Sequence, residues 1–418
     1  MKKIALILSL FSVILTSKVY AQPESPQPFE NAQDSQNTTN SPFSQQSFVP
    51  DISLIVDSAY VYRNIANETF SSLKIPGFTN GIEEFGINGF NLNYAELSFA
   101  STVDPYFDLL AVIPVTPEGV ELEEAFINTR SLPFSFQLKA GKFRSSWGRL
   151  NSMHEHAWNF NDPPVVYTAL FGGEQLNETG VQLNWLAPFD TYLLLGTEIL
   201  QGENKSSFGT KGFTLGKNTI EEINRPNLVL GFAKTSVDIG NLTLLGGLSY
   251  AQGATRQNEK AEDPKDSTAF DGFTRVVGAD LTLKYFLTSY TYLALQSEFM
   301  YRNLSGSNYD SANNITSVSK NQSGLYSQLI WRFNELWRTG LRYDLMLQND
   351  IFEKNVNTNS PGNLARYSAM VEYDATEFSR FRLQFNHDRS KFAENIIPVN
   401  EMYLQLNMSI GAHGAHAF

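Results

Sequence analysis

The sequence has no cysteine and only five histidines among its 418 residues. The absence of cysteine excludes disulfide bonds, thiolate nucleophiles and cysteine-bound metal centres. After residue 21, no apolar run approaches the roughly 20 residues that a membrane-spanning helix requires. Only helices and closed β-barrels satisfy every backbone hydrogen bond in lipid, so a membrane protein with this sequence must be a closed barrel.

The motifs that carry common enzyme chemistry are absent as well. The sequence has no nucleophile elbow, phosphate-binding loop, dinucleotide fingerprint or metalloprotease helix. A barrel hydrolase such as a lipase needs a nucleophile beside a histidine, and no convincing serine–histidine pair is evident. We therefore expect neither enzyme activity nor a cofactor. The formal net charge of −12 argues against nucleic acid as a partner.

The N-terminus has the composition of an export signal. Two lysines precede an apolar core over residues 4–15, and a small-residue site ends at Ala21. We expect a signal peptide over residues 1–21, cleaved after Ala21, with an uncleaved anchor as the alternative. Loss of its three lysines moves the formal charge from −12 to about −15. Residues 22–50, rich in Gln, Ser, Asn and Pro, are expected to form a flexible periplasmic leader.

From residue 51 onward, segments of about ten residues alternate between apolar and polar side chains. The alternation is strict over residues 402–410, with Met, Leu or Ile at even positions and Tyr, Gln, Asn or Ser at odd positions. This period of two predicts a strand with one apolar and one polar face. The chain ends in Phe418, in phase with the apolar face. A closing strand that ends in Phe resembles the signal recognised by the barrel-assembly machinery of bacterial outer membranes.

Short and long connections alternate between the segments, and about 16 segments are present. An even number of antiparallel strands with short turns at one end and long loops at the other is typical of outer-membrane barrels. We therefore expect an all-β fold over residues 51–418. It is a transmembrane antiparallel β-barrel of about 16 strands, with short periplasmic turns and long external loops.

Three consecutive strands near the C-terminus carry arginines at their inward positions, and acids alternate with them. A barrel this wide leaves an aqueous channel, so we expect a wet interior. The arginines are expected to form a basic wall that screens solutes by charge and also contains salt bridges. The alternative is a set of salt bridges that only stabilises the barrel. The arginines are Arg338, Arg342, Arg366 and Arg382, and the acids are Asp344, Glu372 and Asp374.

The long connection over residues 145–178 is the third external connection of the predicted barrel. In general porins the third loop folds into the lumen and narrows it. By this analogy, Arg149, Glu155 and Asp162 would set the electric field at a constriction. The alternative is an ordinary surface loop, stabilised by its tryptophans and prolines.

The same connection contains His154 and His156, and the C-terminal tail contains His413 and His416. Imidazole nitrogens are common zinc ligands, so the two pairs are candidate metal ligands. However, the pairs come from opposite ends of the predicted barrel chain, and the tail should lie on the periplasmic side. Ordinary surface histidines are the simpler interpretation.

The segments NYAELSFASTVDPYFDLLA, GVELEEAFINTRSLPFSFQLKAGKFRSSWGRLN and GVQLNWLAP lie between residues 93 and 204. They resemble porin-like proteins grouped with the phosphate-selective porins, most specifically around Gly141-Lys142-Phe143. The ending GAHGAHAF resembles the tail of zinc-regulated outer-membrane proteins. The resemblance implies a trimeric channel of about 16 strands. Those porins line the pore with an arginine ladder and a lysine cluster, whereas here the loops are acidic or rich in Ser and Asn. The dense basic group comprises Lys139, Lys142, Arg144 and Arg149, and phosphate specificity does not follow from it.

We therefore expect a porin in the outer membrane of a Gram-negative bacterium, which forms a passive diffusion channel for small hydrophilic solutes or ions. Its expected partners are outer-membrane lipid, the solutes, the barrel-assembly machinery and, by resemblance, two further copies of the chain. The alternative function is uptake or binding of a metal such as zinc, or of another ligand, through the histidine pairs.

Overall fold

The computed structural model describes residues 50–78, 86–259, 267–358, 360–393 and 395–411. The expected signal peptide and nearly all of the leader lie outside the described residues, as do His413, His416 and Phe418.

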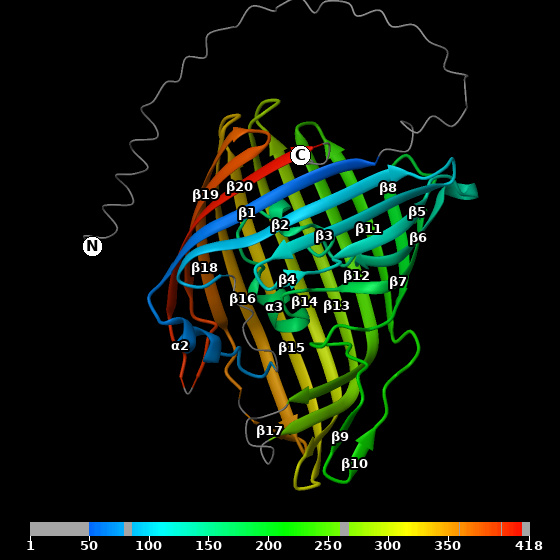
Figure 1. Ribbon diagram of the computed structural model, residues 1–418, viewed down its shortest axis with the longest axis vertical. Coiled ribbons are helices and arrows are strands. Elements are labelled where there is room, and N and C mark those ends of the chain that lie inside the picture. Colours follow the sequence, from blue (N-terminus) through cyan, green and yellow to red (C-terminus); the bar gives the residue numbers. More distant parts are fainter. Residues whose placement is uncertain (1–49, 79–85, 260–266, 359, 394, 412–418) are drawn as a thin grey trace, which may run out of the picture. The chain divides into compact units, whose positions relative to one another are not determined.

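Within the described residues, sixteen antiparallel strands form a closed barrel (Figure 1). This confirms the predicted fold class. The strands are β1 (Asp51–Arg63), β2 (Gly89–Thr102), β3 (Phe107–Thr116), β5 (Glu124–Thr129), β6 (Phe136–Arg144), β7 (Asn177–Leu186), β8 (Tyr192–Leu200), β11 (Leu228–Ile239), β12 (Leu242–Glu259), β13 (Thr268–Phe286), β14 (Tyr292–Asp310), β15 (Ile315–Arg332), β16 (Trp337–Glu353), β18 (Leu364–Thr376), β19 (Ser379–Asp388) and β20 (Val399–Gly411).

Short elements lie in the connections. The two-residue strands β4 (Gly119–Val120) and β17 (Val356–Asn357) pair with β3 and β16, and β9 (Phe213–Leu215) pairs with β10 (Asn218–Ile220). The helical segments are α2 (Asn67–Ser72), η2 (Pro133–Ser135), η3 (Glu155–Ala157) and α3 (Val165–Phe171). None of these described helices is long and apolar enough to cross a membrane.

The barrel closes between its first and last strands. β1 pairs with β2 on one side and with β20 on the other, in a register that places Leu54 opposite Ile410 and Arg63 opposite Glu401. Within the described residues, each of the sixteen barrel strands therefore has a partner on both sides.

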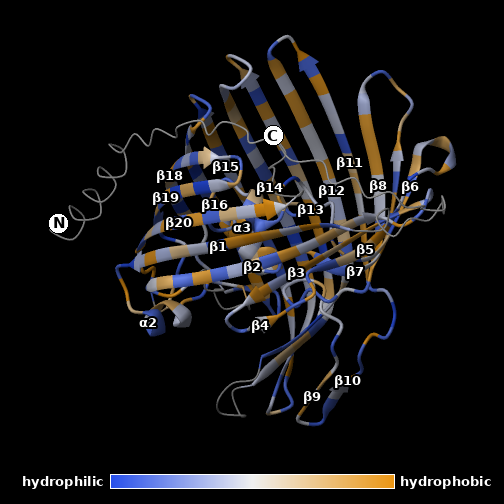
Figure 2. Cartoon of the chain, turned by 45° about the horizontal axis from the view of Figure 1, so that its top comes forward, coloured by the Kyte–Doolittle hydropathy of each residue, from blue (hydrophilic) through white to orange (hydrophobic). Residues whose placement is uncertain are grey.

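The two faces of the strands follow the predicted alternation, which appears as hydrophobic and hydrophilic bands in Figure 2. On β18, Tyr367 is 52% exposed toward the outside whereas its neighbour Arg366 is 5% exposed. On β20, Met408 is exposed and Asn407 is buried. Apolar side chains therefore form the outer surface and polar side chains face inward.

The strands β12 to β15 are longer than predicted, with 18 or 19 residues each. Polar stretches that alternation assigns to loops, such as residues 268–274, continue the ladder between β13 and β14. Backbone pairing between two strands needs no apolar face. The hydrophobic pattern therefore marks the part of a strand that has an apolar outer face and misses its polar end.

The interior is not the open aqueous space expected from the width of the barrel. Residues 145–176, here called the inserted loop, fold inside the barrel and carry η3 and α3 (Figures 1 and 2). Buried apolar side chains of this loop pack against buried apolar side chains on the inner face of the barrel, and together they form one cluster. Its members include Trp147, Trp158, Val166, Leu170 and Phe171 of the loop, and Leu200, Leu228, Leu230, Val276, Met300 and Met346 of the strands.

Candidate functional site in the barrel interior

Two inward glutamates hold the beginning of the inserted loop. Glu198 of β8 accepts hydrogen bonds from the Ser145 hydroxyl at 2.6 Å and the Ser146 amide at 2.8 Å. Glu298 of β14 accepts bonds from the amides of Arg149 and Leu150, both at 3.0 Å. Both carboxylates are buried, so these loop donors replace the water that each charge would otherwise require.

Asp162 holds the second half of the loop. Its carboxylate forms ion pairs with Arg342 at 2.8 Å and Arg366 at 2.6 Å. It also accepts hydrogen bonds from the side chains of Gln384 at 2.6 Å and Asn386 at 3.0 Å. Burial alone would raise the pKa of Asp162, but the two arginines and these bonds hold it well below its usual range. Asp162 therefore stays ionised and fixes the loop to β16, β18 and β19.

The remaining inward arginines also contact the loop. Arg382 donates to the carbonyl of Trp158 at 2.8 Å and pairs with Glu372 at 2.6 Å. Arg338 pairs with the same Glu372 and donates to Asn159. Of the arginines of the expected basic wall, Arg342, Arg366 and Arg382 are thus buried between inward acids and the inserted loop, and Arg338 is half-buried there.

Two inward glycines allow the loop to approach the barrel closely. A Cβ on Gly278 of β13 would lie 2.6 Å from Cζ2 of Trp147. A Cβ on Gly324 of β15 would lie 3.0 Å from Cγ2 of Val166. The absent side chains at these two positions therefore make room for the loop.

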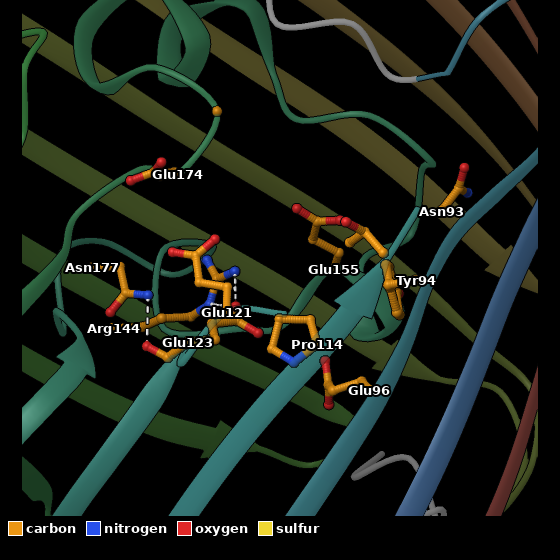
Figure 3. Close-up of a pocket in the computed structure, with 12 residues that line it drawn as sticks. Asn93, Tyr94, Glu96, Pro114, Glu121, Glu123, Arg144, Glu155, Glu174 and Asn177 are labelled. Atoms are coloured by element: carbon orange, nitrogen blue, oxygen red, sulfur yellow. Dashed lines mark hydrogen bonds and ion pairs between the residues drawn. The ribbon is translucent and has the colours of Figure 1, made fainter. Parts of the chain in front are cut away.

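The loop leaves space beside β1, β2 and β3. One cavity of about 250 Å³ and another of about 510 Å³ share Asn93, Tyr94 and Glu155 in their linings. We call the two together the acidic passage, and Figure 3 shows the residues that line the smaller cavity. Among the described residues that line it, the acids are Asp57, Glu96, Glu118, Glu121, Glu123, Glu155 and Glu174, and the basic residue is Arg144, which pairs with Glu123.

The two histidines of the inserted loop lie at the edge of this passage. Their rings stack with centroids 5.6 Å apart. Nε2 of His154 lies 2.8 Å from Oε2 of Glu124, and its Nδ1 lies 3.5 Å from Oε2 of Glu123 and 3.7 Å from Oε2 of Glu96. Nδ1 of His156 lies 3.6 Å from the same oxygen of Glu96.

Burial and neighbouring charge shift the pKa values of two of these loop groups. Burial lowers the pKa of His154, but the nearby carboxylates of Glu123, Glu124 and Glu96 outweigh it and raise the pKa to about 10. Burial raises the pKa of Glu155 to about 7, against the opposing effect of Arg144. The passage therefore combines a cationic histidine with a carboxyl group that titrates near neutrality.

The residues predicted from the sequence fall into different surroundings. Asp162, Arg338, Arg342, Asp344, Arg366, Glu372 and Arg382 lie in the ion-pair network beneath the loop. Arg144 and Glu155 line the passage, and Lys142 pairs with its Glu121 at 3.7 Å. Lys139 lies over the ring of Phe126, and the backbone amide of Arg149 binds Glu298. The predicted basic group therefore does not converge on one point.

Five acids that contact the inserted loop were not predicted from the sequence. A signal was available for three of them, because a single glutamate inside a strongly alternating strand stands out from its apolar neighbours, as in the segments AELSF and TEILQ. The missed residues are Glu96, Glu123, Glu124, Glu198 and Glu298.

No known family model matches the chain. Its structure is similar to that of the outer membrane channel DcaP of Acinetobacter baumannii, with a TM-score of 0.52, 11% identity, and coverage of 88% of this chain and 99% of that one. It is also similar to OmpT, an outer membrane protein of Vibrio cholerae, with a TM-score of 0.50, 9% identity, and coverage of 87% and 98%. At these identities the likeness shows the fold alone, and it does not confirm the resemblance to the phosphate-selective or zinc-regulated group.

A protein with much higher sequence identity to this chain than these solved structures is also known. An uncharacterized protein of Aquifex aeolicus (strain VF5) is 49% identical over 386 residues, which cover 90% of this chain and 82% of that protein. The chain belongs to the family of this Aquifex aeolicus protein, and its fold is similar to those of the outer membrane channel DcaP and the outer membrane protein OmpT.

Proposed function

We propose that the chain forms a passive channel for small hydrophilic solutes or ions in the outer membrane of a Gram-negative bacterium, and that the channel favours cations. The observation that carries this proposal is the acidic passage beside the inserted loop. Its lining acids outnumber the single lining arginine within the described residues. A narrow path between low-dielectric walls focuses the field of such charges and raises the local concentration of counter-ions.

The size of the passage supports a small-solute channel. The inserted loop fills the side of the barrel toward β11–β18 with apolar side chains and ion pairs, so permeation is confined to the side of β1–β3. Cavities of about 250 and 510 Å³ suit hydrated ions and small metabolites.

The inward arginines give little support to anion selectivity. Arg342, Arg366 and Arg382 have side chains that are 2%, 6% and 0% exposed, and each is paired with a carboxylate. Their charge is therefore balanced locally, and their contacts bind the loop.

The proposal includes three further parts. The N-terminal residues act as a cleaved export signal, the barrel-assembly machinery inserts the chain, and the chain forms a homotrimer. One OmpT structure is a trimer form, which supports the last part by analogy of fold.

Single-channel recording in planar bilayers tests the proposal. The refolded protein should give stable current steps, and a salt gradient should give a reversal potential of the sign for cation preference. Glu121→Gln together with Glu174→Gln should reduce that preference. The matched control is Glu335→Gln, because Glu335 is exposed on the turn between β15 and β16. Folded, inserted protein that carries no current would refute the channel, and an anionic reversal potential would refute the cation preference.

A further inference from the structure

A group of nitrogen and oxygen atoms with metal-ligand spacing lies where the inserted loop meets β2 and the start of β5. Nδ1 of His154 and one carboxylate oxygen each of Glu96 and Glu123 lie within 4.8 Å of one another. Nδ1 of His156 lies 3.6 Å from the same oxygen of Glu96. The group combines residues from three parts of the chain, so only the closed barrel brings it together.

The distances fit coordination better than hydrogen bonding. A tetrahedral zinc ion with bonds of 2.0–2.2 Å separates its ligand atoms by about 3.3–3.6 Å. Nδ1 of His154 is 3.5 Å from Glu123 and 3.7 Å from Glu96. Hydrogen bonds between nitrogen and oxygen are usually shorter, at about 2.7–3.2 Å. This nitrogen is buried and has no hydrogen-bond partner among the described residues.

The opposite side of the His154 ring supports a ligand role for Nδ1. Nε2 lies 2.8 Å from the carboxylate of Glu124, which is within hydrogen-bonding distance. Metal-binding histidines usually donate their second ring N–H to a carboxylate in this way, because that bond fixes the tautomer and orients the ring. With the proton on Nε2, the lone pair of Nδ1 points at two carboxylate oxygens. That arrangement needs a positive charge between them, either a proton on Nδ1 or a metal ion.

The surroundings favour an exchangeable ion. Glu96 and Glu123 also line the acidic passage (Figure 3), so an ion that enters the passage reaches the group directly. Three protein ligands leave a tetrahedral ion one further position, and His156 is the nearest candidate for it because its Nδ1 lies 3.6 Å from Glu96.

We infer that Glu96, Glu123 and His154, with His156 at the fourth position, bind a divalent transition-metal ion of the zinc class inside the barrel. The mixed imidazole and carboxylate donors favour zinc, cobalt or nickel over magnesium and calcium, which prefer all-oxygen sites. The ion replaces the proton on Nδ1 of His154 and neutralises part of the acidic passage. Metal binding can be tested separately from conduction, because it is measured on detergent-solubilised protein without a current.

Equilibrium dialysis of the refolded full-length chain with zinc tests the site, and cobalt supplies a spectroscopic probe of tetrahedral coordination. A His413→Ala/His416→Ala variant removes the histidines of the C-terminal tail, so that zinc bound there does not contribute to the measurement. This tail variant should still bind one ion with unchanged affinity and show the visible cobalt bands. His154→Gln and Glu96→Gln, each made in the tail variant, should weaken binding at least about tenfold and abolish the cobalt bands.

The matched control is His387→Gln, because His387 of β19 pairs with Asn400 away from the group. A conservative second variant, Glu124→Gln, keeps a side chain that can accept from Nε2 and should weaken binding less than His154→Gln. No zinc binding in the tail variant would overturn the inference. Binding that is unchanged by both His154→Gln and Glu96→Gln in a barrel of normal heat stability would also overturn it. Neither result bears on whether the barrel conducts.

Discussion

Arg366 of β18 donates a hydrogen bond of 2.6 Å to Asp162 of the inserted loop, across 204 positions of sequence. Arg342 of β16 holds the other oxygen of the same carboxylate at 2.8 Å. These contacts place the loop inside the barrel as a fixed part of the structure, so its release should change both stability and permeation.

Asp162→Ala should release the second half of the inserted loop. The substitution leaves Arg342 and Arg366 buried without one of their carboxylates, and breaking such a buried pair costs about 3–5 kcal/mol. We expect lower heat stability, larger and noisier current steps, and new proteolytic cleavage between residues 145 and 176. Asp190→Asn is the control, because Asp190 is exposed on the turn between β7 and β8. Unchanged conductance and protease resistance would show that other contacts suffice to hold the loop.

Gly278→Ala should displace Trp147 from the inner face of β13. The added Cβ would lie 2.6 Å from the indole, and such overpacking costs about 1–3 kcal/mol. Tryptophan fluorescence should shift to longer wavelength and the unfolding temperature should fall. Gly246→Ala on β12 is the matched control, because its nearest neighbouring atom is 3.7 Å away. Equal stability of the two variants would contradict the close packing at Gly278.

Glu298→Ala should loosen the beginning of the loop. Glu298 accepts hydrogen bonds from two loop amides and from the hydroxyls of Tyr167 and Tyr326. Each buried donor that loses its acceptor costs about 1–3 kcal/mol, so the variant should unfold more readily than Glu298→Gln, which keeps an acceptor oxygen. Denaturant titration of both variants gives the comparison, and the reverse order of stability would argue against this anchor.

Cation preference should increase as the pH rises through neutrality. The pKa of Glu155 is raised to about 7, by burial first and then by the charges of Glu123, Asp57 and Glu96, while Arg144 opposes the shift. Glu155 is therefore neutral below that pH and adds a negative charge to the passage above it. Reversal potentials recorded from pH 5.5 to 8.5 should show a step near pH 7 that Glu155→Gln removes. An identical pH profile in this variant would assign the step to another group.

The raised pKa of Glu155 also makes the stability of the folded chain depend on pH. The folded chain holds the Glu155 proton up to about pH 7, whereas the unfolded chain releases it near the usual value for glutamate. The stabilisation from this group is therefore fully present below the unfolded pKa and is lost as the pH rises toward 7. Glu155→Gln should flatten that part of the stability profile.

The strands of the barrel wall could be predicted from the pattern of amino acids alone. Alternation with a period of two identified the strands and their faces, because successive residues of a strand point to opposite sides of the sheet. The exposed Met408 and buried Asn407 on β20 follow this rule. The turns could also be predicted from local sequence, as at Gly240, where the backbone has a positive φ of 60° that glycine adopts readily.

The contents of the barrel interior depend on contacts between distant parts of the chain. Residues 145–176 carry no alternation that separates an inserted loop from a surface loop, and their position depends on partners such as Glu298 and Arg366, far away in the sequence. The same holds for His154, whose neighbours Glu96 and Glu123 belong to other elements. Local patterns cannot predict such contacts, because they form only when barrel closure brings distant inward faces around one space.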